Sequence, residues 1–324
     1  MHPRLLEKML SQGGVFSAGD AASCRYTRGD LRAMVRTERW RELGRRVYTT
    51  REAWEAAETP AARHRLELAA RLLRCRPGTV AGHRSAAVAH GLPLLGAPPV
   101  VPILTREGAQ SGSRFVKVAQ LPQSERVVVN ALRSTSLDRS VVDISRGSSF
   151  RAAVVTADAA LRQGLHPAVL LATAERWSHW PRGRRAVAVA LFADGRAESP
   201  LESLGRVALH EQGVEPPELQ VEVWLGGLLI ARVDHLWEEL LCIGEADGMG
   251  KYDEPGALRA EKRRQEALEQ VGFEVVRYDW EDAYRRQAEL AGRFRSGFAR
   301  GHGNVLDPRV RLVRTQTRVV PRAA

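Results

Sequence analysis

The sequence predicts a mixed α/β protein that is divided into several domains. Its 324 residues are 44% hydrophobic, which is enough for two or three buried cores at roughly 100–200 residues per domain. Helical and strand periodicities alternate along the chain, which is typical of a mixed α/β fold. The net charge also changes sign along the chain, which separates a basic front from an acidic segment.

The charge distribution is the first indication of a partner. Residues 1–50 carry a net charge of +5 and residues 51–196 of +10, whereas residues 197–300 hold 13 basic and 21 acidic side chains, a net of −8. The tail, residues 302–324, is basic again. Basic regions of this kind indicate a polyanion such as DNA. An arginine-rich proteome is the alternative, but it does not explain the acidic segment.

The sequence also predicts a cytoplasmic protein with no membrane partner. Met1–Leu10 is charged and lacks the apolar core of a signal peptide. The uncharged stretch Ser85–Thr105 contains four prolines, so we expect a helix end, a loop and a strand rather than a spanning helix. The three cysteines are far apart and odd in number, which argues against a disulfide framework and against a Cys-rich zinc site.

Three short helices and a β-hairpin are predicted over residues 1–50. Ser17 is expected to cap a helix over Ala18–Cys24, and Thr27 to cap the next one, with Asp30 at its third position. A strand, a basic turn and a second strand follow. This is the order of a winged helix-turn-helix, in which the second helix of the pair enters the major groove of DNA.

Five arginines of this segment are the candidate DNA-binding residues. Arg28, Arg32 and Arg36 recur at every fourth position, along the exposed face of the second helix. Arg45 and Arg46 lie in the turn of the hairpin, where cations contact phosphate. The alternative is a solvated face on a winged helix that makes only protein contacts.

The stretch GGVFSAGDAASCRYTRGDLRAMVRTERWRELGRRVYTT has a G-V-F opening, a basic second helix and a closing R-x-V-Y. It resembles the N-terminal domain of AbiEi-type antitoxins of type IV toxin–antitoxin systems. TSLDRSVVDIS and FRAAVVTADAALRQG resemble the downstream part of the same proteins. The resemblance implies double-stranded DNA as a partner and a cognate toxin as another. The oligomeric state stays open, with a homodimer as one candidate.

A middle α/β domain is predicted over residues 60–197. We expect helices over Arg63–Leu73, His83–Gly91, Ser136–Ser145, Phe150–Gln163 and His166–Trp180, and strands over Val100–Leu104, Phe115–Leu121, Val127–Leu132 and Ala186–Phe192. No phosphate-binding loop, nucleophile elbow or dinucleotide fingerprint is present in this segment.

Residues 198–301 predict a domain with the element order αβββαβα. The expected elements are Leu201–Gln212, Leu219–Leu225, Leu228–Trp237, Leu240–Asp247, Leu258–Val271, Phe273–Tyr278 and Glu281–Phe294. Asp234 is late in the second strand and Glu245 lies in the third. If these strands pair, both carboxylates meet at one edge of the sheet, where Mg²⁺ or Mn²⁺ would relieve their repulsion.

The same segment carries the strings SPLES, RVDHLW, EADG, KY, EKRR and VVRYDW. Together they resemble the Vsr-like domains of the PD-(D/E)XK fold, which restriction endonucleases share. The resemblance implies metal-dependent hydrolysis of DNA, with Asp234 and Glu245 as metal ligands and Glu202 as a further acidic group. Asp247 is a candidate third ligand of the metal. Asp247 stands where nucleases of this fold have Lys, so the catalytic cation must come from elsewhere.

Three basic residues are candidates for that cation, namely Lys251, Lys262 and Arg264, of which Arg264 is expected to face the sheet. Two functions stay open. One is a DNA-binding protein with an active Mg²⁺-dependent endonuclease domain. The other is a transcriptional repressor or antitoxin in which the nuclease fold has lost catalysis and only binds.

Overall fold

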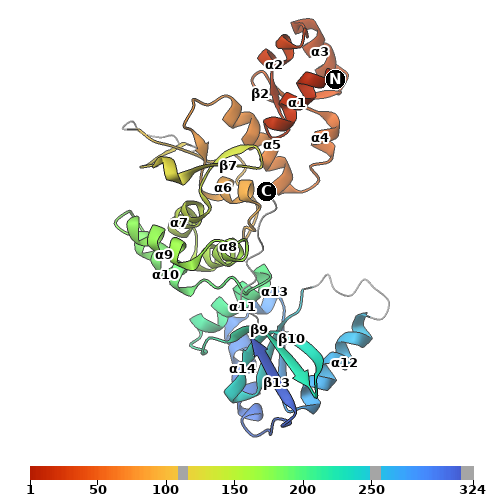
Figure 1. Ribbon diagram of the computed structural model, residues 1–324, viewed down its shortest axis with the longest axis vertical. Coiled ribbons are helices and arrows are strands. Elements are labelled where there is room, and N and C mark those ends of the chain that lie inside the picture. Colours follow the sequence, from red (N-terminus) through yellow and green to blue (C-terminus); the bar gives the residue numbers. More distant parts are fainter. Residues whose placement is uncertain (109–115, 249–256, 315–324) are drawn as a thin grey trace. The chain divides into compact units, whose positions relative to one another are not determined.

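The computed structural model describes residues 1–108, 116–248 and 257–314 and is mixed α/β, as the sequence predicts (Figure 1). The chain forms two compact units. Unit 1 comprises Met1–Thr156 and Leu165–Leu191, and unit 2 comprises Ala157–Gly164 and Phe192–Ala324. The sequence pattern separates the first 50 residues from the middle segment, whereas unit 1 contains both.

The N-terminal part of unit 1 has the predicted helices and hairpin. Its elements are α1 (Pro3–Ser11), β1 (Phe16–Ser17), α2 (Ala18–Ser23), α3 (Arg28–Arg36), β2 (Trp40–Gly44) and β3 (Val47–Thr50), and the strand order is β1-β3-β2. Ser17 and Thr27 each form a capping box, with Asp20 and Asp30 respectively, so both predicted caps are confirmed. Trp40 is buried in the core of this part, where its ring centroid lies 4.8 Å from that of Phe16.

The remainder of unit 1 is a second sheet with helices. Its strands, in the order β6-β5-β4-β8-β7, are β4 (Val80–Ala81), β5 (Leu104–Arg106), β6 (Val116–Val118), β7 (Arg126–Val129) and β8 (Leu132–Thr135). The helices are α4 (Arg51–Glu55), α5 (Pro60–Leu73), α6 (His83–His90), the 3-10 turn Gln123–Glu125, α7 (Leu137–Gly147), α8 (Phe150–Arg162), α9 (Pro167–Arg176) and α10 (Gly183–Phe192). Helix α8 belongs to unit 2 from Ala157 on, as does Phe192, the last residue of α10.

One apolar core explains why the first 50 residues do not form a domain separate from the rest of unit 1. Val15 and Val47, from the N-terminal part, pack in the same cluster as Leu68 of α5, Leu104 of β5 and Leu132 of β8. All five side chains are at most 3% exposed. Because burial of apolar surface is cooperative within one core, the two segments form one unit.

The prediction of a strand over Ala186–Phe192 is wrong, because these residues belong to helix α10. The run of apolar residues is short, and periodicity does not separate a buried strand from a buried helix at this length. The burial pattern decides it: Ala186, Val189 and Ala190 are buried, at helical spacing, whereas Leu191 is 69% exposed.

Unit 2 contains a five-stranded sheet in the order β12-β11-β10-β9-β13. Its elements are α11 (Pro200–Glu211), β9 (Glu218–Leu225), β10 (Leu228–Trp237), the 3-10 turn Glu238–Leu240, β11 (Cys242–Ala246), α12 (Ala257–Gln270), β12 (Glu274–Tyr278), α13 (Trp280–Tyr284), α14 (Gln287–Gly301) and β13 (Val310–Arg314). Strands β11 and β12 are parallel, and the other neighbours are antiparallel.

The last predicted helix, Glu281–Phe294, is two helices in the structure. Helix α13 begins at a capping box in which Asp279 and Asp282 exchange hydrogen bonds, and α14 starts after a break at Arg286, whose φ and ψ are −107° and 42°. Leu290 and Phe294 of α14 are fully buried. The break therefore separates α14, whose apolar face lies in the core, from the short helix that starts at the Asp279 cap.

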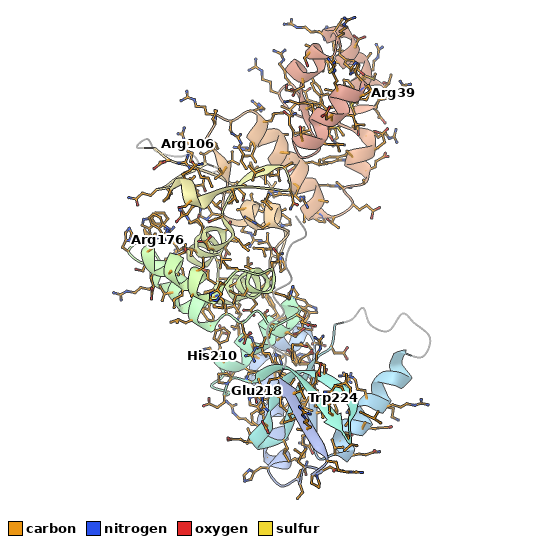
Figure 2. All side chains as sticks on the ribbon, viewed as in Figure 1. Arg39, Arg106, Arg176, His210, Glu218 and Trp224 are labelled. Atoms are coloured by element: carbon orange, nitrogen blue, oxygen red, sulfur yellow. The ribbon has the colours of Figure 1, made fainter. Side chains whose placement is uncertain are left out.

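The tail contributes the edge strand β13, which pairs with β9. Arg314 donates hydrogen bonds to both carboxylate oxygens of Glu218, at 2.7 and 2.8 Å, and Figure 2 labels Glu218 and Trp224 on β9. Arg309 pairs in the same way with Asp307. These arginines are thus neutralised locally, and residues 315–324 lie outside the described part of the tail.

Along the described ranges, we find no helix with both the length and the apolar character that a membrane span requires. The uncharged stretch Ser85–Thr105 contains the end of α6, a loop and the start of β5, as predicted.

Candidate functional site

Strands β10 and β11 bring Asp234 and Glu245 together. His235 pairs with Gly244 across the two antiparallel strands, so the next residues in register, Asp234 and Glu245, lie opposite one another on one face of the sheet. The backbone N–H of Ala246 donates to Oδ2 of Asp234 at 2.9 Å. The two carboxylates that the sequence singles out are therefore neighbours.

These carboxylates are part of a polar row that crosses four strands. On one side, Gln220 of β9 faces Asp234, because the pairs on either side of it join Leu219 to His235 and Val221 to Val233. On the other side, Glu245 pairs directly with Arg277 of β12. The row therefore runs Gln220, Asp234, Glu245, Arg277.

Gln220 is the member of the row that the sequence alone does not indicate. Its Nε2 donates to Oδ1 of Asp234 at 3.2 Å and to Oε2 of Glu202 at 2.9 Å, and the residue is 4% exposed. Its φ of +55° is a strained value for a residue other than glycine. A buried amide in strained backbone thus holds two carboxylates in place. The only sequence signal was a polar residue inside an apolar strand.

Glu202 approaches the row from the first turn of α11. Ser199 caps this helix through the backbone N–H of Glu202, and Oε2 of Glu202 accepts the N–H of Glu198 at 2.8 Å. Burial raises the pKa of Glu202, and the charge of Asp234 raises it further. Burial raises the pKa of Tyr278, and the charges of three carboxylates, those of Asp234, Glu202 and Glu245, raise it further. The cluster is therefore a site of concentrated negative charge.

Arg264 of α12 supplies a cation to this cluster. Its two terminal nitrogens donate to Oε1 and Oε2 of Glu245, both at 3.1 Å, and Glu245 is 5% exposed. This bidentate geometry is the strongest form of an arginine–carboxylate contact. Arg264 faces the sheet, as its helical spacing predicts.

The other expected site residues are placed differently. Lys262 is directed to solvent: its side chain is 78% exposed and its Nζ lies 3.7 Å from Oε1 of Glu266. It is therefore not near the carboxylates in this structure. Asp247 forms an ion pair of 3.7 Å with Arg277. Lys251 lies outside the described residues.

The donor chemistry of the cluster fits a hard divalent cation such as Mg²⁺ or Mn²⁺, because Asp234, Glu245 and Glu202 offer carboxylate oxygens. Burial raises the pKa of Glu202 most, and a cation would relieve the repulsion from Asp234 that raises it further. Within the described ranges, no group of three or more His, Cys, Asp or Glu side chains is arranged to hold a metal ion. A cation at Glu245 would compete with Arg264 for its oxygens.

His235 lies on the other face of β10, directly behind the cluster. It is fully buried, and its ring stacks on Tyr278, whose hydroxyl lies 3.3 Å from Nδ1 of His235. Burial and, to a smaller extent, the positive charge of Arg206 lower the pKa of His235 to about 3. His235 is therefore neutral in the folded protein at neutral pH.

We expect this buried histidine to make unit 2 less stable in acid. The unfolded chain binds a proton on His235 below about pH 6.5 and the folded chain does not, so the free energy of unfolding falls below that pH. From about pH 7 to about pH 5.5 the loss is about 1 kcal/mol for one histidine. Urea unfolding of the protein and of His235→Gln at both pH values measures it. An equal pH dependence in the two proteins would contradict the assignment.

The basic residues of the N-terminal part form a separate surface in unit 1. Arg28, Arg32 and Arg36 of α3 are exposed, as are Arg45 and Arg46 in the β2–β3 turn. Within the described ranges, none of these five side chains forms an ion pair with a carboxylate. Arg39, at the start of the hairpin, is also exposed (Figure 2). The surface therefore presents cationic charge to solvent.

No known protein family model matches the chain. Two proteins of Mycobacterium tuberculosis do match it, MT2308 of strain CDC 1551 and Rv2248 of strain H37Rv, and both are named as uncharacterized. Each is 32% identical over 158 residues, which is 47% of this chain and 56% of the relative. The chain spans about half the length of these curated relatives. Their names assign no activity.

Proposed function

We propose that the protein binds double-stranded DNA through its N-terminal part and hydrolyses DNA phosphodiester bonds in unit 2, with Mg²⁺ or Mn²⁺. The observation that carries the catalytic part is that Asp234 lies opposite Glu245, with Gln220 joining Asp234 to Glu202. These four polar side chains, three from the strands and Glu202 from α11, lie together at one face of the sheet. Removing polar groups from water destabilises the folded state, so such a cluster is more typical of a functional site than of a purely structural domain.

The order of elements in unit 2 supports the same proposal. Helix α11, strands β9 to β11, helix α12, strand β12 and the final helices follow the αβββαβα order that the restriction-endonuclease-like fold implies. Asp234, Glu245 and Asp247 are the residues that would hold the metal, with Glu202 beside them. A bound divalent cation would supply an activated water and stabilise the charge that develops on the phosphate.

The other members of the cluster have positioning roles in this proposal. Gln220 fixes the orientation of the Asp234 and Glu202 carboxylates, since one amide nitrogen donates to both. Arg264 takes the place of the lysine that the motif lacks, because its guanidinium contacts both carboxylate oxygens of Glu245. A guanidinium at this point would balance the negative charge of the scissile phosphate. Lys262 has no role, since it faces solvent.

DNA binding is proposed for the five exposed arginines. Helix α3 follows α2 after a short turn and carries Arg28, Arg32 and Arg36. Strands β2 and β3 follow and complete a three-stranded sheet with β1, and the β2–β3 turn carries Arg45 and Arg46. This is the order of a winged helix, in which α3 would enter the major groove and the turn would contact the backbone.

We expect the double variant Arg32→Ala with Arg36→Ala to bind DNA about tenfold more weakly. Each lost phosphate contact also lowers the slope of log Kd against log salt concentration by about 1. Titration of a fluorescent duplex at several salt concentrations measures both quantities. Arg151→Ala is the matched control from elsewhere in unit 1. An unchanged salt slope in the double variant would show that α3 does not contact phosphate.

A second function is favoured by one observation. Arg264 already occupies both oxygens of Glu245, which is how a nuclease fold that has lost its metal would neutralise the carboxylate. The protein would then be a transcriptional repressor or an antitoxin that binds DNA, a cognate toxin or a second copy of itself without cleavage. Relaxation of supercoiled plasmid by the protein with Mg²⁺ or Mn²⁺ distinguishes the two functions.

A further inference from the structure

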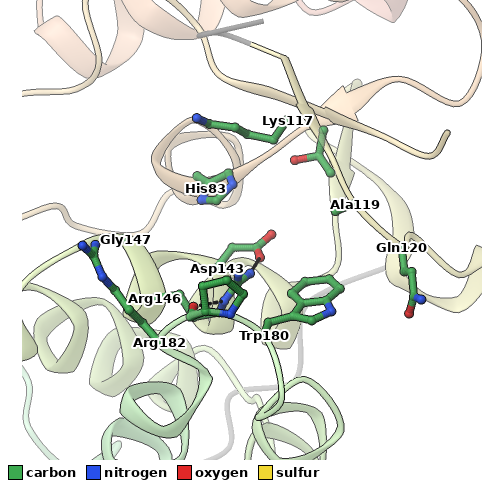
Figure 3. Close-up of a pocket in the computed structure, with 11 residues that line it drawn as sticks. His83, Lys117, Ala119, Gln120, Asp143, Arg146, Gly147, Trp180 and Arg182 are labelled. Atoms are coloured by element: carbon green, nitrogen blue, oxygen red, sulfur yellow. Dashed lines mark hydrogen bonds and ion pairs between the residues drawn. The ribbon is translucent and has the colours of Figure 1, made fainter. Parts of the chain in front are cut away.

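A pocket of about 590 Å³ lies in unit 1, apart from both surfaces described above. It is formed by α6, β5, β6, α7 and the segment between α9 and α10. Figure 3 shows His83 and Lys117 on one side, and Asp143, Arg146 and Trp180 across from them. Pockets of this size are typical of small-molecule sites.

Positive charge predominates in the lining. Among the described lining residues, Lys117, Arg146 and Arg182 are the cations and Asp143 is the one acidic residue. The carboxylate of Asp143 is already used: it accepts from Nε of the buried Arg139 at 3.1 Å and pairs with Arg146 at 3.4 Å. The charges of Lys117 and Arg182 are therefore left uncompensated by the lining.

Two polar groups in the lining are suited to hydrogen bonding with a ligand. Thr105 is 1% exposed, and its Oγ1 has no hydrogen-bond partner among the described residues. Such a buried, unpaired hydroxyl is costly unless a ligand completes it. Burial lowers the pKa of His83, and the charges of Lys117 and Arg146 lower it too, whereas Asp143 raises it. His83 is therefore a neutral donor or acceptor.

The indole ring of Trp180 packs against the guanidinium groups of Arg139 and Arg146, so it is not available to stack on a ligand. The guanidinium carbons of Arg139 and Arg146 each lie 4.6 Å from the centroid of its ring, and the ring of Trp177 is 4.2 Å away. These contacts hold the Arg146 guanidinium in a fixed orientation. The ring has little area left on which a base could stack, so charge and hydrogen bonds must dominate recognition.

We propose that this pocket binds a small phosphorylated molecule, with Lys117, Arg146 and Arg182 around the phosphate. Guanidinium and ammonium groups are the usual partners of phosphate, and Arg146 is preorganised by its contacts. The pocket volume exceeds that of a phosphate ion, which leaves space for the organic part of the molecule, within reach of Thr105 and His83. The proposal does not depend on catalysis in unit 2.

Calorimetric titration of the full chain with pyrophosphate, ADP and adenosine tests the proposal. Pyrophosphate and ADP are expected to bind, and adenosine, which lacks phosphate, is not. The double variant Lys117→Gln with Arg182→Gln should bind both at least about tenfold more weakly, because two charge-assisted contacts are lost. Both side chains are exposed, so the fold should be retained, which circular dichroism checks.

Arg184→Gln is the matched control, since Arg184 is exposed and close in sequence but does not line the pocket. It should bind pyrophosphate and ADP as the unmodified protein does. Three results would overturn the proposal: no binding of either phosphate compound at millimolar concentration, equal binding by the double variant, or equal binding of adenosine. Displacement of ADP by a single-stranded oligonucleotide at equal phosphate concentration would assign the pocket to nucleic acid instead.

Discussion

Replacement of Asp234 by Asn is expected to reduce Mg²⁺-dependent cleavage of plasmid DNA by at least about 100-fold. The amide keeps the size of the side chain and one acceptor oxygen, which can replace one of the two acceptors that Asp234 offers, Oδ2 to the Ala246 N–H and Oδ1 to Gln220 Nε2. It removes the negative charge that a divalent cation requires. The rate at which supercoiled plasmid becomes nicked or linear, measured with Mg²⁺ and with Mn²⁺, gives the effect directly.

The control for Asp234→Asn is the same substitution at another carboxylate of unit 2, and a DNA-binding assay separates loss of cleavage from loss of binding. Asp307→Asn removes the same charge from unit 2, at a residue that pairs with Arg309 and not with the cluster, and should cleave normally. Binding of duplex DNA should be the same in all three proteins, because the exposed arginines lie in unit 1. If the unmodified protein binds DNA but does not cleave it with either metal, the repressor or antitoxin function is the one that remains.

Replacement of Arg139 by Met is expected to lower the free energy of unfolding of unit 1 by about 3–5 kcal/mol. Arg139 is fully buried, and its Nη1 and Nε donate to Glu125 and Asp143, whose side chains are 2% exposed. Without the guanidinium, two buried carboxylates lose their main cation. Urea unfolding followed by tryptophan fluorescence reports it, since Trp177 and Trp180 lie against the guanidinium.

The comparison that isolates the charge effect is a triple variant, Arg139→Met with Glu125→Gln and Asp143→Asn. It leaves no unpaired buried charge, so it should be more stable than the single variant. Arg184→Met, at an exposed position, should change the free energy of unfolding by no more than about 0.5 kcal/mol. A cost below about 1 kcal/mol for Arg139→Met would show that the two carboxylates find other partners or take up protons.

Local signals in the sequence predict much of the secondary structure. The caps at Ser17 and Thr27 are correct because a hydroxyl followed three residues later by Asp satisfies the free N–H groups of a helix end, and this needs no distant contact. The segment Ala186–Phe192 was predicted wrongly because its helical conformation depends on which of its apolar residues are buried. That information comes from tertiary packing.

The candidate site was only partly predictable for a related reason. The positions of Asp234 and Glu245 follow from a simple antiparallel pairing of two consecutive strands. The positions of Gln220 and Arg277 depend on the register of β9 and on a parallel pairing with β12, which local periodicity does not determine. The exposure of Lys262 likewise depends on the rotation of α12 against the sheet.

The edge strand β13 has a consequence for synthesis on the ribosome. It follows all other described strands of unit 2 in the chain, yet it covers β9, the first of them. While the nascent polypeptide is still emerging, β9 presents unpaired backbone N–H and C=O groups and the side chains of Trp224 and Leu225. If translation pauses before Val310, β9 is an unpaired edge strand. Such an edge can pair with a strand of another chain, so we expect the nascent protein to be prone to aggregation at this stage.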